Sequence, residues 1–284
     1  MSSAARSPDP TLSGPVEVCV DRPVLALDRP FTYAVPEGMA VRVGSIVQIA
    51  FHGRRIHGWA LGPSDPVPRM QPVRGVLSPV PAFDATMLEL LRWMSERYVA
   101  PLATMIDRAV PPRVAGEEAD APEPRPPDVP QAPPPSVLPT YDGGPDLLRA
   151  IAGGGGGAAL LRPGATDAAT VAVEAVGAAL ASGRTAIVVV PEADPLPATA
   201  VALREAFGPS VALFLGGDRR ERYRAWLDIR GGRHAVVVGT HPAVFAPLPD
   251  LGLVLVSREG HGQHREERAP HANVREVAAA RARL

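Results

Sequence analysis

A proline-rich segment between Val114 and Tyr141 constrains the fold of this chain most, because it separates two regions with different hydrophobic periodicity. It reads AGEEADAPEPRPPDVPQAPPPSVLP, with nine prolines and no apolar repeat. Proline fixes the φ angle and removes a backbone donor, so such a run favours an extended chain. We therefore predict a linker over residues 115–140, between folded regions at 16–114 and 141–284.

The composition fits a globular cytoplasmic protein. The 284 residues are 46% apolar, enough for two modest cores. Cys19 is the single cysteine, which excludes a disulfide framework and a cysteine-based zinc site and predicts a core residue. Residues 1–15 lack the apolar stretch of a signal peptide and are predicted to be disordered, and no run is long enough to span a membrane. The net charge of −1 gives no support to nucleic-acid binding through bulk electrostatics.

Residues 16–114 show the alternation of a small β barrel or sandwich. Val16, Val18 and Val20 fall on one face of a strand, and the short runs FTYAV, SIVQIAF, RIHGWAL and VRGVL follow. Asp84 is a predicted N-cap, followed by apolar residues at helical spacing and by a second short helix that ends at a Pro-Pro pair. We expect a barrel-like sheet with the helices on one face.

Residues 141–284 change to the pattern of a parallel α/β sheet. The apolar runs AALL, AIVVV, VALFL, AVVVG and LGLVLV alternate with helical stretches that begin at Ala168, Pro197 and Asp218. Strands that helices cover on both faces read as continuous apolar runs, so we expect these strands to be fully buried. The final stretch, NVREVAAARARL, predicts a helix with no strand after it, which suggests an incomplete sheet. The predicted fold class is α+β followed by α/β.

Several strings, in this order, resemble the replication-restart helicase family of primosomal protein N′. In the first region DRPFTYAVPEGM, VRVGSIVQIAF and SERYVAPLATMIDRAVPPR are similar to the family's 3′ DNA-binding domain. In the second, VVVPEADPL, the ERYRAW string, VVVGTHPAVFAPLPDLGLVLV and RAPHANVREV are similar to its first helicase lobe. The resemblance implies a DNA-binding domain and an incomplete RecA-like lobe of the P-loop NTPase type. It is nearest to the ATPase-deficient branch of high-GC Gram-positive bacteria, cut after the second ATPase motif.

The phosphate loop that the resemblance implies is degenerate. Where the family has Gly-x-x-x-x-Gly-Lys-Thr, this chain has PGATDAAT, in which Ala168 replaces a glycine, Ala169 replaces the lysine and Thr170 is retained. That lysine normally reaches the β- and γ-phosphates, and the chain has no lysine anywhere. Asp167 would bring negative charge toward a phosphate, although an N-cap of the following helix is the favoured interpretation.

The metal-binding motif that the resemblance implies is also replaced. Ser257, Arg258 and Glu259 stand where the family has Asp-Glu-Glu, whose carboxylates hold Mg²⁺ and position water. We therefore expect no catalytic residues, and we expect neither ATP nor Mg²⁺, which the family uses, to act as a cofactor here.

The resemblance places DNA contact in a pocket of the first region that receives the last nucleotide of a strand at a stalled fork. There an aromatic ring stacks on the base, a glycine turn lets the backbone approach and a basic group meets phosphate. The predicted DNA-binding residues are Phe31, Thr32, His52, Gly53, Arg54 and Arg74. Thr32 replaces the family's Asp, so a 3′ hydroxyl would be held more weakly. The open alternatives are a core role for Phe31 and ordinary surface charges for the arginines.

Two further patterns have bland interpretations that we favour. The run Gly153–Gly157 lacks the lysine of a phosphate loop and is interpreted as a flexible connector. His261, His264 and His271 lie near three glutamates, but a solvated loop is favoured over a metal site, and no metal is expected.

Three functions remain open from the sequence. The first is a DNA-binding replication-restart factor that recognises forked DNA or 3′ ends, assembles with other restart proteins and does not hydrolyse ATP. The second is an ATP-dependent 3′ to 5′ DNA helicase, which the replaced motifs oppose. The third is a protein-interaction platform of the replication machinery, which the near-neutral charge favours.

Overall fold

The computed structural model describes residues 9–164 and 166–284, and these divide into two compact units. The first unit ends at Ala119, and the second runs from Asp120 to Leu284. Of the segment predicted to be disordered, residues 1–8 lie outside the described residues, as does Ala165 in the degenerate phosphate loop.

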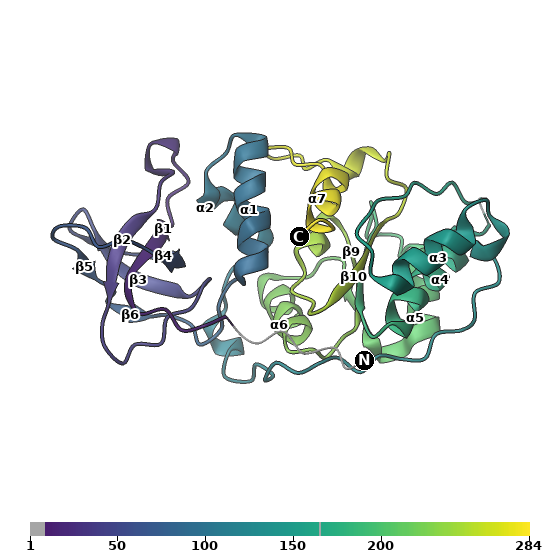
Figure 1. The fold of residues 1–284 in the computed structure, drawn as a ribbon, viewed down its shortest axis with the longest axis horizontal. Coiled ribbons are helices and arrows are strands. Elements are labelled where there is room, and N and C mark those ends of the chain that lie inside the picture. The colour runs from purple at the N-terminus through teal and green to yellow at the C-terminus, as the bar shows by residue number, and fades with distance from the viewer. Residues whose placement is uncertain (1–8, 165) are drawn as a thin grey trace. The chain divides into compact units, whose positions relative to one another are not determined.

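The first unit begins with a curled, mostly antiparallel sheet that has the form of a half-barrel (Figure 1). Its strands are β1 (Gly14–Val20), β2 (Phe31–Val35), β3 (Ile46–Phe51), β4 (Arg54–Pro63), β5 (Gln71–Pro72) and β6 (Gly75–Val76). Their order is β5-β2-β1-β4-β3-β6. The edge strands β5 and β6 belong to one short segment, in which the Val73 amide donates to Ala34 of β2 and the Arg74 amide donates to Gln48 of β3. This segment therefore joins the two edges of the curled sheet.

Alternation along β1 builds the core of this sheet, as predicted. Val16, Val18 and Val20 are at most 2% exposed, and they pack on one face with residues of the other strands. Cys19 points to the other face and is buried as well, opposite Trp59 of β4. Burial, together with nearby carboxylates, raises the pKa of the Cys19 thiol to about 12, so this cysteine is an inert core residue.

The chain is ordered before the predicted start of the domain. The Leu12 amide donates to the Val41 carbonyl at 2.7 Å, and the Leu12 side chain is only 9% exposed. Asp9 accepts a hydrogen bond from the amide of Ala85. The prediction of disorder is therefore wrong for residues 9–15, because an apolar residue among the Ser and Pro residues anchors them.

Two helices complete the first unit, α1 (Ala85–Tyr98) and α2 (Leu102–Ala109). Asp84 caps α1 by accepting a 2.7 Å hydrogen bond from the Met87 amide, which confirms the predicted cap. The helices pack on each other, and α2 also contacts β1. Their apolar faces, including Leu91 and Met105, are buried, as the helical spacing predicts.

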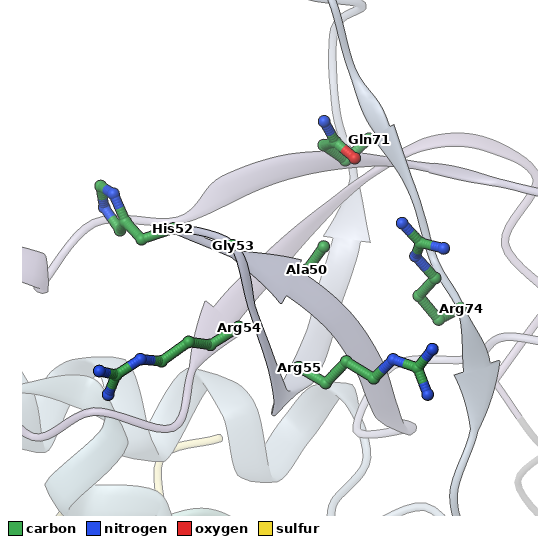
Figure 2. A pocket seen from close by; sticks show the side chains of 7 residues that line it. All are labelled: Ala50, His52, Gly53, Arg54, Arg55, Gln71 and Arg74. Atoms are coloured by element: carbon green, nitrogen blue, oxygen red, sulfur yellow. The ribbon is translucent and has the colours of Figure 1, made fainter.

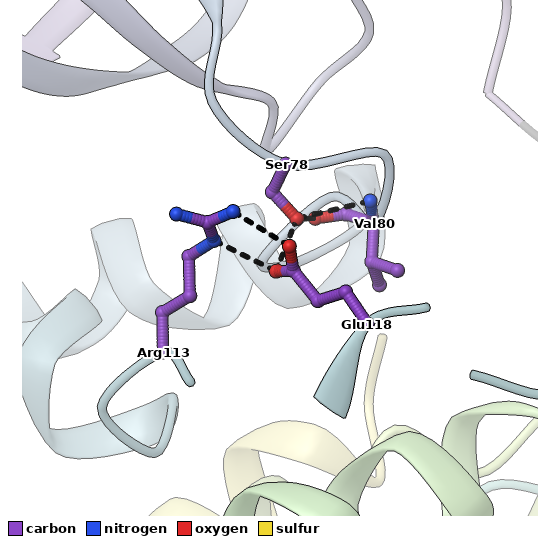
Figure 3. A network of polar contacts seen from close by, with 4 residues as sticks. All are labelled: Ser78, Val80, Arg113 and Glu118. Carbon is purple, nitrogen blue, oxygen red and sulfur yellow. Dashed lines mark hydrogen bonds and ion pairs between the residues drawn. The ribbon is translucent and has the colours of Figure 1, made fainter. Parts of the chain in front are cut away.

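A buried ionic network lies at the end of the first unit (Figure 3). Glu118 accepts two hydrogen bonds from the Arg113 guanidinium, at 2.7 and 2.6 Å. It accepts a third from the Ser78 hydroxyl at 2.7 Å, and the amide of Val80 donates to the same hydroxyl. The Glu118 side chain is 5% exposed, so the paired guanidinium compensates a charge that has lost its water. The network ties residues 113–118 to the loop that follows β6.

The second unit is a parallel sheet between two layers of helices (Figure 1). Its strands are β7 (Thr185–Val189), β8 (Val211–Phe214), β9 (Val236–Gly239) and β10 (Leu251–Val256), in the order β10-β7-β9-β8. Its helices are α3 (Gly144–Gly153), α4 (Ala168–Ala181), α5 (Ala198–Phe207), α6 (Arg219–Arg230) and α7 (Val274–Arg281). Short 3-10 turns in the chain lie at Leu25–Leu27, Ala115–Glu117, Leu138–Thr140, Gly208–Ser210, His241–Phe245 and Gly262–His264. The α+β and α/β classes predicted for the two regions are confirmed.

The layers follow from the alternation within each strand. Residues such as Val188 and Val236 pack with α4 and α5, which lie with α3 on one side of the sheet, while α6 and α7 lie on the other (Figure 1). The helices predicted to begin near Ala168, Pro197 and Asp218 are all present. Helix α3 was not predicted from the sequence.

Two strand predictions fail at the edge of this sheet. Residues 158–161, the AALL run, form no strand in the described chain, and Leu160 is 64% exposed. The run is short and follows five glycines, which disfavour a strand, so it gains neither a pairing partner nor cover. As a consequence β10 is an edge strand, and its residues are half-buried along its whole length instead of fully buried.

The proline-rich segment is extended but lies against the second unit. The Arg125 amide donates to Gly231, where a Cβ atom would lie 2.2 Å from Pro122, so a glycine permits the close approach. Farther along, the buried Glu174 carboxylate of α4 accepts hydrogen bonds from the three amides of residues 136–138, at 2.7, 2.8 and 2.6 Å. Burial would raise the pKa of Glu174, but these hydrogen bonds outweigh it and lower the pKa. From Asp120 on, the segment is thus a packed strap of the second unit and differs from a free spacer.

None of the helices in the described chain is both long and apolar enough to cross a membrane.

Candidate nucleic-acid interface

A pocket of about 390 Å³ lies at the hairpin between β3 and β4 in the first unit. Its lining is formed by Ala50, His52, Gly53, Arg54, Arg55, Gln71 and Arg74 (Figure 2). The structure thus brings together four of the predicted DNA-binding residues, which come from the hairpin and from the segment that joins the sheet edges.

The hairpin turn positions one side of the pocket. Phe51 pairs with Arg54, which leaves a two-residue turn of His52 and Gly53 with φ angles of 46° and 74°. A two-residue hairpin turn with both φ angles positive matches the twist of the strands, and Gly53 adopts this conformation without strain. The turn sets Arg54 and Arg55 at the start of β4, directly beside the pocket.

The closing segment positions the other side. The Arg74 amide donates to the Gln48 carbonyl at 2.8 Å, which fixes Arg74 beside β3. Gln71 pairs in parallel with Tyr33, whose hydroxyl donates to the Ala50 carbonyl at 3.0 Å. Backbone hydrogen bonds to the neighbouring strands therefore fix Arg74 and Gln71 in the pocket lining.

The charged side chains that line the pocket are all arginines. Arg55 and Arg74 extend to the same side of the hairpin, and Arg54 extends to the other (Figure 2). All three are exposed, and none forms an ion pair with another residue in the described parts of the chain. None of the described residues that line the pocket carries a carboxylate. Unpaired guanidinium groups present planar donor forks that match phosphate.

Phe31 and Thr32, also predicted to bind DNA, do not line this pocket. The ring of Phe31 makes an edge contact with Phe51 at 5.0 Å between centroids, and the Arg29 guanidinium lies 5.2 Å from its centroid. Phe31 packs at the margin of the sheet core, which agrees with the alternative left open for it. The Thr32 hydroxyl lies 3.0 Å from the Ser64 hydroxyl and is hydrogen-bonded to it.

Sequence reasoning did not select three residues of the lining. Arg55 is not among the predicted DNA-binding residues, although its place directly after Arg54 and the glycine turn is a usable signal. Ala50 and Gln71 carried no signal, because their position depends on closure of the sheet by a segment about twenty residues away in the chain.

The end of β10, where the family's metal ligands would lie, is internally paired. Arg258 lies 3.4 Å from Glu192, and His261 approaches the same carboxylate at 3.2 Å. Glu259, the acid that remains of the motif, lies 3.3 Å from Arg275. The carboxylates at this edge of the sheet thus face cations of the chain itself.

The degenerate phosphate loop is hydrogen-bonded to a tyrosine that precedes it in the chain. The hydroxyl of Tyr141 donates to the Asp167 carboxylate at 2.8 Å and accepts from the Gly164 amide at 2.8 Å. Asp167 stands at the N-cap position of α4, but its side chain makes no capping hydrogen bond, so the predicted cap is wrong. Its carboxylate accepts hydrogen bonds from the hydroxyls of Tyr141 and Thr166 instead. Ala168, Ala169 and Thr170 form the first turn of α4.

The histidine segment is only partly solvated. His264 is 1% exposed, and its Nε2 lies 2.8 Å from the Ser257 carbonyl, so the prediction of a solvated loop is wrong for this residue. Burial lowers its pKa, which favours the neutral ring. In the described parts of the chain, no three His, Cys, Asp or Glu side chains are grouped as metal ligands would be.

The pocket lies within a part of the chain that is similar to known proteins. Residues 17–111 match the family described as 3′DNA-binding domain (3′BD). The chain is 35% identical over 269 residues to a probable replication restart protein PriA of Mycobacterium tuberculosis (strain H37Rv), covering 90% of this chain and 40% of the relative. The protein of the same name in Mycobacterium leprae is 32% identical over 268 residues, with 90% and 41% covered. Replication restart protein PriA of Treponema pallidum is 28% identical over 281 residues, with 89% and 40% covered.

The chain thus spans about 40% of the length of the curated relatives it matches. The matched domain is the curled sheet with its two helices, and the similarity to the relatives continues through the second unit. Residues 17–111 thus match the 3′ DNA-binding domain family, and 90% of the chain is similar to the replication restart protein PriA.

Proposed function

We propose that this chain is a replication-restart factor of the cytoplasm that binds forked DNA or 3′ strand ends and does not hydrolyse ATP. The observation that carries the DNA-binding part is the pocket, where Arg55 and Arg74 extend to one side without a carboxylate in the lining. Backbone phosphates supply most of the affinity between proteins and DNA, and such a pocket attracts them although the net charge of the chain is −1. Assembly with other replication-restart proteins belongs to the same proposal.

The second unit supports the absence of ATP hydrolysis in two ways. At the end of β10 the Glu192 carboxylate faces the Arg258 guanidinium and the His261 imidazole, so a magnesium ion would have to displace these side chains. At the start of α4 the carboxylate of Asp167, held by Tyr141, lies where a phosphate would approach the helix. ATP and Mg²⁺ are therefore not cofactors of this chain in our proposal.

A fork-binding titration combined with a phosphate-release assay tests both parts. We expect the full chain to bind a labelled fork at low salt, with an affinity that falls linearly on a logarithmic scale as salt rises. We expect phosphate release at the background level with or without DNA. No fork binding at low salt would contradict the DNA-binding part, and DNA-stimulated release would revive the helicase alternative.

A second candidate is a protein-interaction platform, favoured by the edge strand β10. Its sequence LGLVLV is apolar, half-buried and unpaired on one edge within the described chain. Exposed strand edges are templates for pairing with another chain. Binding to purified replication-restart proteins that survives nuclease treatment, together with an absence of fork binding, would favour this candidate over the first.

A further inference from the structure

Three aliphatic side chains are exposed at one end of the first unit. Val24 and Leu25, in the loop between β1 and β2, are 50% and 65% exposed, and Val99, in the turn between α1 and α2, is 80% exposed. The loop and the turn meet, because the Asp28 carboxylate accepts a 2.8 Å hydrogen bond from the amide of Leu102 (Figure 1). We call these three side chains the apolar tip.

Hydrogen bonds hold both segments of the apolar tip in place. The amide of Asp28 donates to the Leu25 carbonyl at 3.1 Å, so Leu25 lies within one turn of the residue that bonds to α2. In the turn that contains Val99, the Ala100 amide donates to the Ser95 carbonyl at 3.1 Å, and the Ser95 hydroxyl donates back to the Ala100 carbonyl at 2.7 Å. A surface that is already ordered loses little conformational entropy when it binds a ligand.

The backbone of Val99 is unusual for its residue type. Its φ and ψ angles are 50° and 53°, in the left-handed region, which is rare for a β-branched residue and easier for glycine or asparagine. Because the side chain is exposed, no packing in the core offsets this strain. A strained apolar residue on the surface indicates a role in binding.

The charges around the apolar tip favour an anionic ligand. Arg22 and Arg29 flank the loop, both are exposed, and neither has a carboxylate partner among the described residues. Of the acids nearby in the sequence, Asp28 is bonded to an amide, and the charge of Glu96 is offset by the adjacent Arg97. The tip is therefore an apolar surface with a positive rim.

The end of a DNA duplex has the complementary surface. Its last base pair exposes a flat, largely apolar face, and the phosphates of both strands lie around it. Apolar side chains contact the faces of base pairs in this way where proteins kink DNA. The branch point of a fork exposes such a base pair at the end of a duplex arm. The match to the 3′DNA-binding domain family spans both segments of the apolar tip.

We propose that the apolar tip covers the exposed base pair at the branch point of a fork, with Arg22 and Arg29 toward the flanking phosphates. The inference rests on the proposed DNA-binding function and adds to it a contact with a duplex end. It does not involve the pocket at the β3–β4 hairpin, which is lined by other residues.

A fork with a fluorescent adenine analogue in the base pair next to the branch point tests this inference on the full chain. Stacking quenches the emission of the analogue, and opening of the pair restores it. We expect the emission to fall when the wild type binds, because a covered base pair opens less often. A single strand of the same length serves as the substrate without a duplex end.

Two variants locate the contact. Leu25→Ser combined with Val99→Asn should weaken fork binding about fivefold at low salt, because apolar area stays in water, and should leave single-strand binding unchanged. Asparagine accepts the left-handed conformation, so we expect no loss of stability in urea denaturation, and Leu25→Ser alone tests the tip if the double variant is less stable. Val67→Ser is the matched control, at a position of the same unit that is 44% exposed and outside the tip, and it should bind both substrates like the wild type.

The outcomes separate this inference from the proposed function. If the double variant binds the fork like the wild type, the inference is overturned and the tip is left to a protein partner. An equal loss of fork and single-strand binding also overturns it, as does emission that stays constant or rises when the wild type binds. Failure of the wild type to bind any fork at low salt refutes the proposed function together with the inference.

Discussion

Arginine side chains are used differently in the two units. At the hairpin pocket of the first unit, Arg55 and Arg74 are exposed and have no ion pair among the described residues. At the end of β10 in the second unit, Arg258 lies against Glu192, and the remaining acid of the motif, Glu259, is paired as well. An unpaired cation keeps its field for a ligand, whereas a paired cation contributes to the structure of its own chain. Pairing therefore separates the site that can recruit an anion from the one that cannot.

The glycines of the two loops also differ. At the pocket, Gly53 of the turn is exposed, and a Cβ atom there would meet nothing within 4 Å. In the degenerate phosphate loop, the Gly164 amide already donates to Tyr141, which in turn holds Asp167. A loop of this kind binds phosphate only when its amides face the ligand. In the second unit the Gly164 amide is already hydrogen-bonded within the chain and is not available to a nucleotide.

The largest expected effect is on the stability of the first unit. Glu118→Ala removes the buried carboxylate that accepts two hydrogen bonds from Arg113 and one from Ser78. We expect the free energy of unfolding to fall by about 3 kcal/mol, measured by urea denaturation of the full chain. Glu89→Ala, at an exposed position of α1, should change it by less than about 0.5 kcal/mol. Equal effects of the two changes would show that this pairing does not stabilise the unit.

The next effect concerns the strap of the second unit. Glu174→Ala leaves the amides of residues 136–138 without their acceptor, and we expect a loss of about 2 kcal/mol in urea denaturation. Glu205→Ala, exposed on α5, is the matched control. A loss no greater than that of the control would contradict the packed strap.

The pH dependence of the Glu174 effect has a defined sign. Its pKa is lower in the folded chain than the ordinary carboxyl value of 4.5, so its contribution is present above that value. The contribution is lost as the pH falls through the lowered folded pKa. The stability difference between wild type and Glu174→Gln should therefore shrink in this acidic window, and a difference that grows there would be inconsistent with the hydrogen bonds described.

A smaller effect is expected at the sheet of the first unit. The hydrogen bond from His57 to Asp21, 2.6 Å between heavy atoms, raises the pKa of His57 above 6.5, although its burial opposes this. The pair therefore stabilises the fold fully below pH 6.5 and loses this contribution as the pH rises through the raised pKa. Because His57 is half exposed, the contribution is about 0.5 kcal/mol. His57→Gln should flatten this part of the pH profile of thermal stability, and an unchanged profile would refute the pair's role.

The smallest effect on stability is expected at the pocket itself. Arg55→Ala and Arg74→Ala remove exposed, unpaired cations, so each should change the free energy of unfolding by less than about 0.5 kcal/mol. Each should nevertheless weaken fork binding and reduce its salt dependence. A stability loss comparable to that of Glu118→Ala would break the comparison between paired and unpaired arginines.

The sequence was sufficient where local patterns decide the structure. Alternation at Val16, Val18 and Val20 predicted a core strand, and the Asp84 cap predicted the start of α1 correctly. The turn at His52 predicted one side of the pocket. In these cases the signal lies within a few residues of the element it specifies.

Local patterns failed where a distant partner decides. The AALL run has the composition of a strand but pairs with no described strand, and Asp167, expected as a cap, is hydrogen-bonded to Tyr141 instead. The place of Gln71 in the pocket lining depends on closure of the sheet, and the hydrogen bonds that Glu174 accepts depend on the position of the strap. Such contacts join residues that are more than twenty positions apart, and no periodicity in the sequence marks them.

Hydrogen–deuterium exchange of the full chain tests the central contrast most directly, with forked DNA and with Mg–ATP as separate ligands. The account predicts that forked DNA protects the peptides that span residues 50–55 and 71–74, and that Mg–ATP protects neither residues 166–170 nor residues 257–259. Protection of the latter two segments by Mg–ATP, with no protection of the hairpin by DNA, would contradict it.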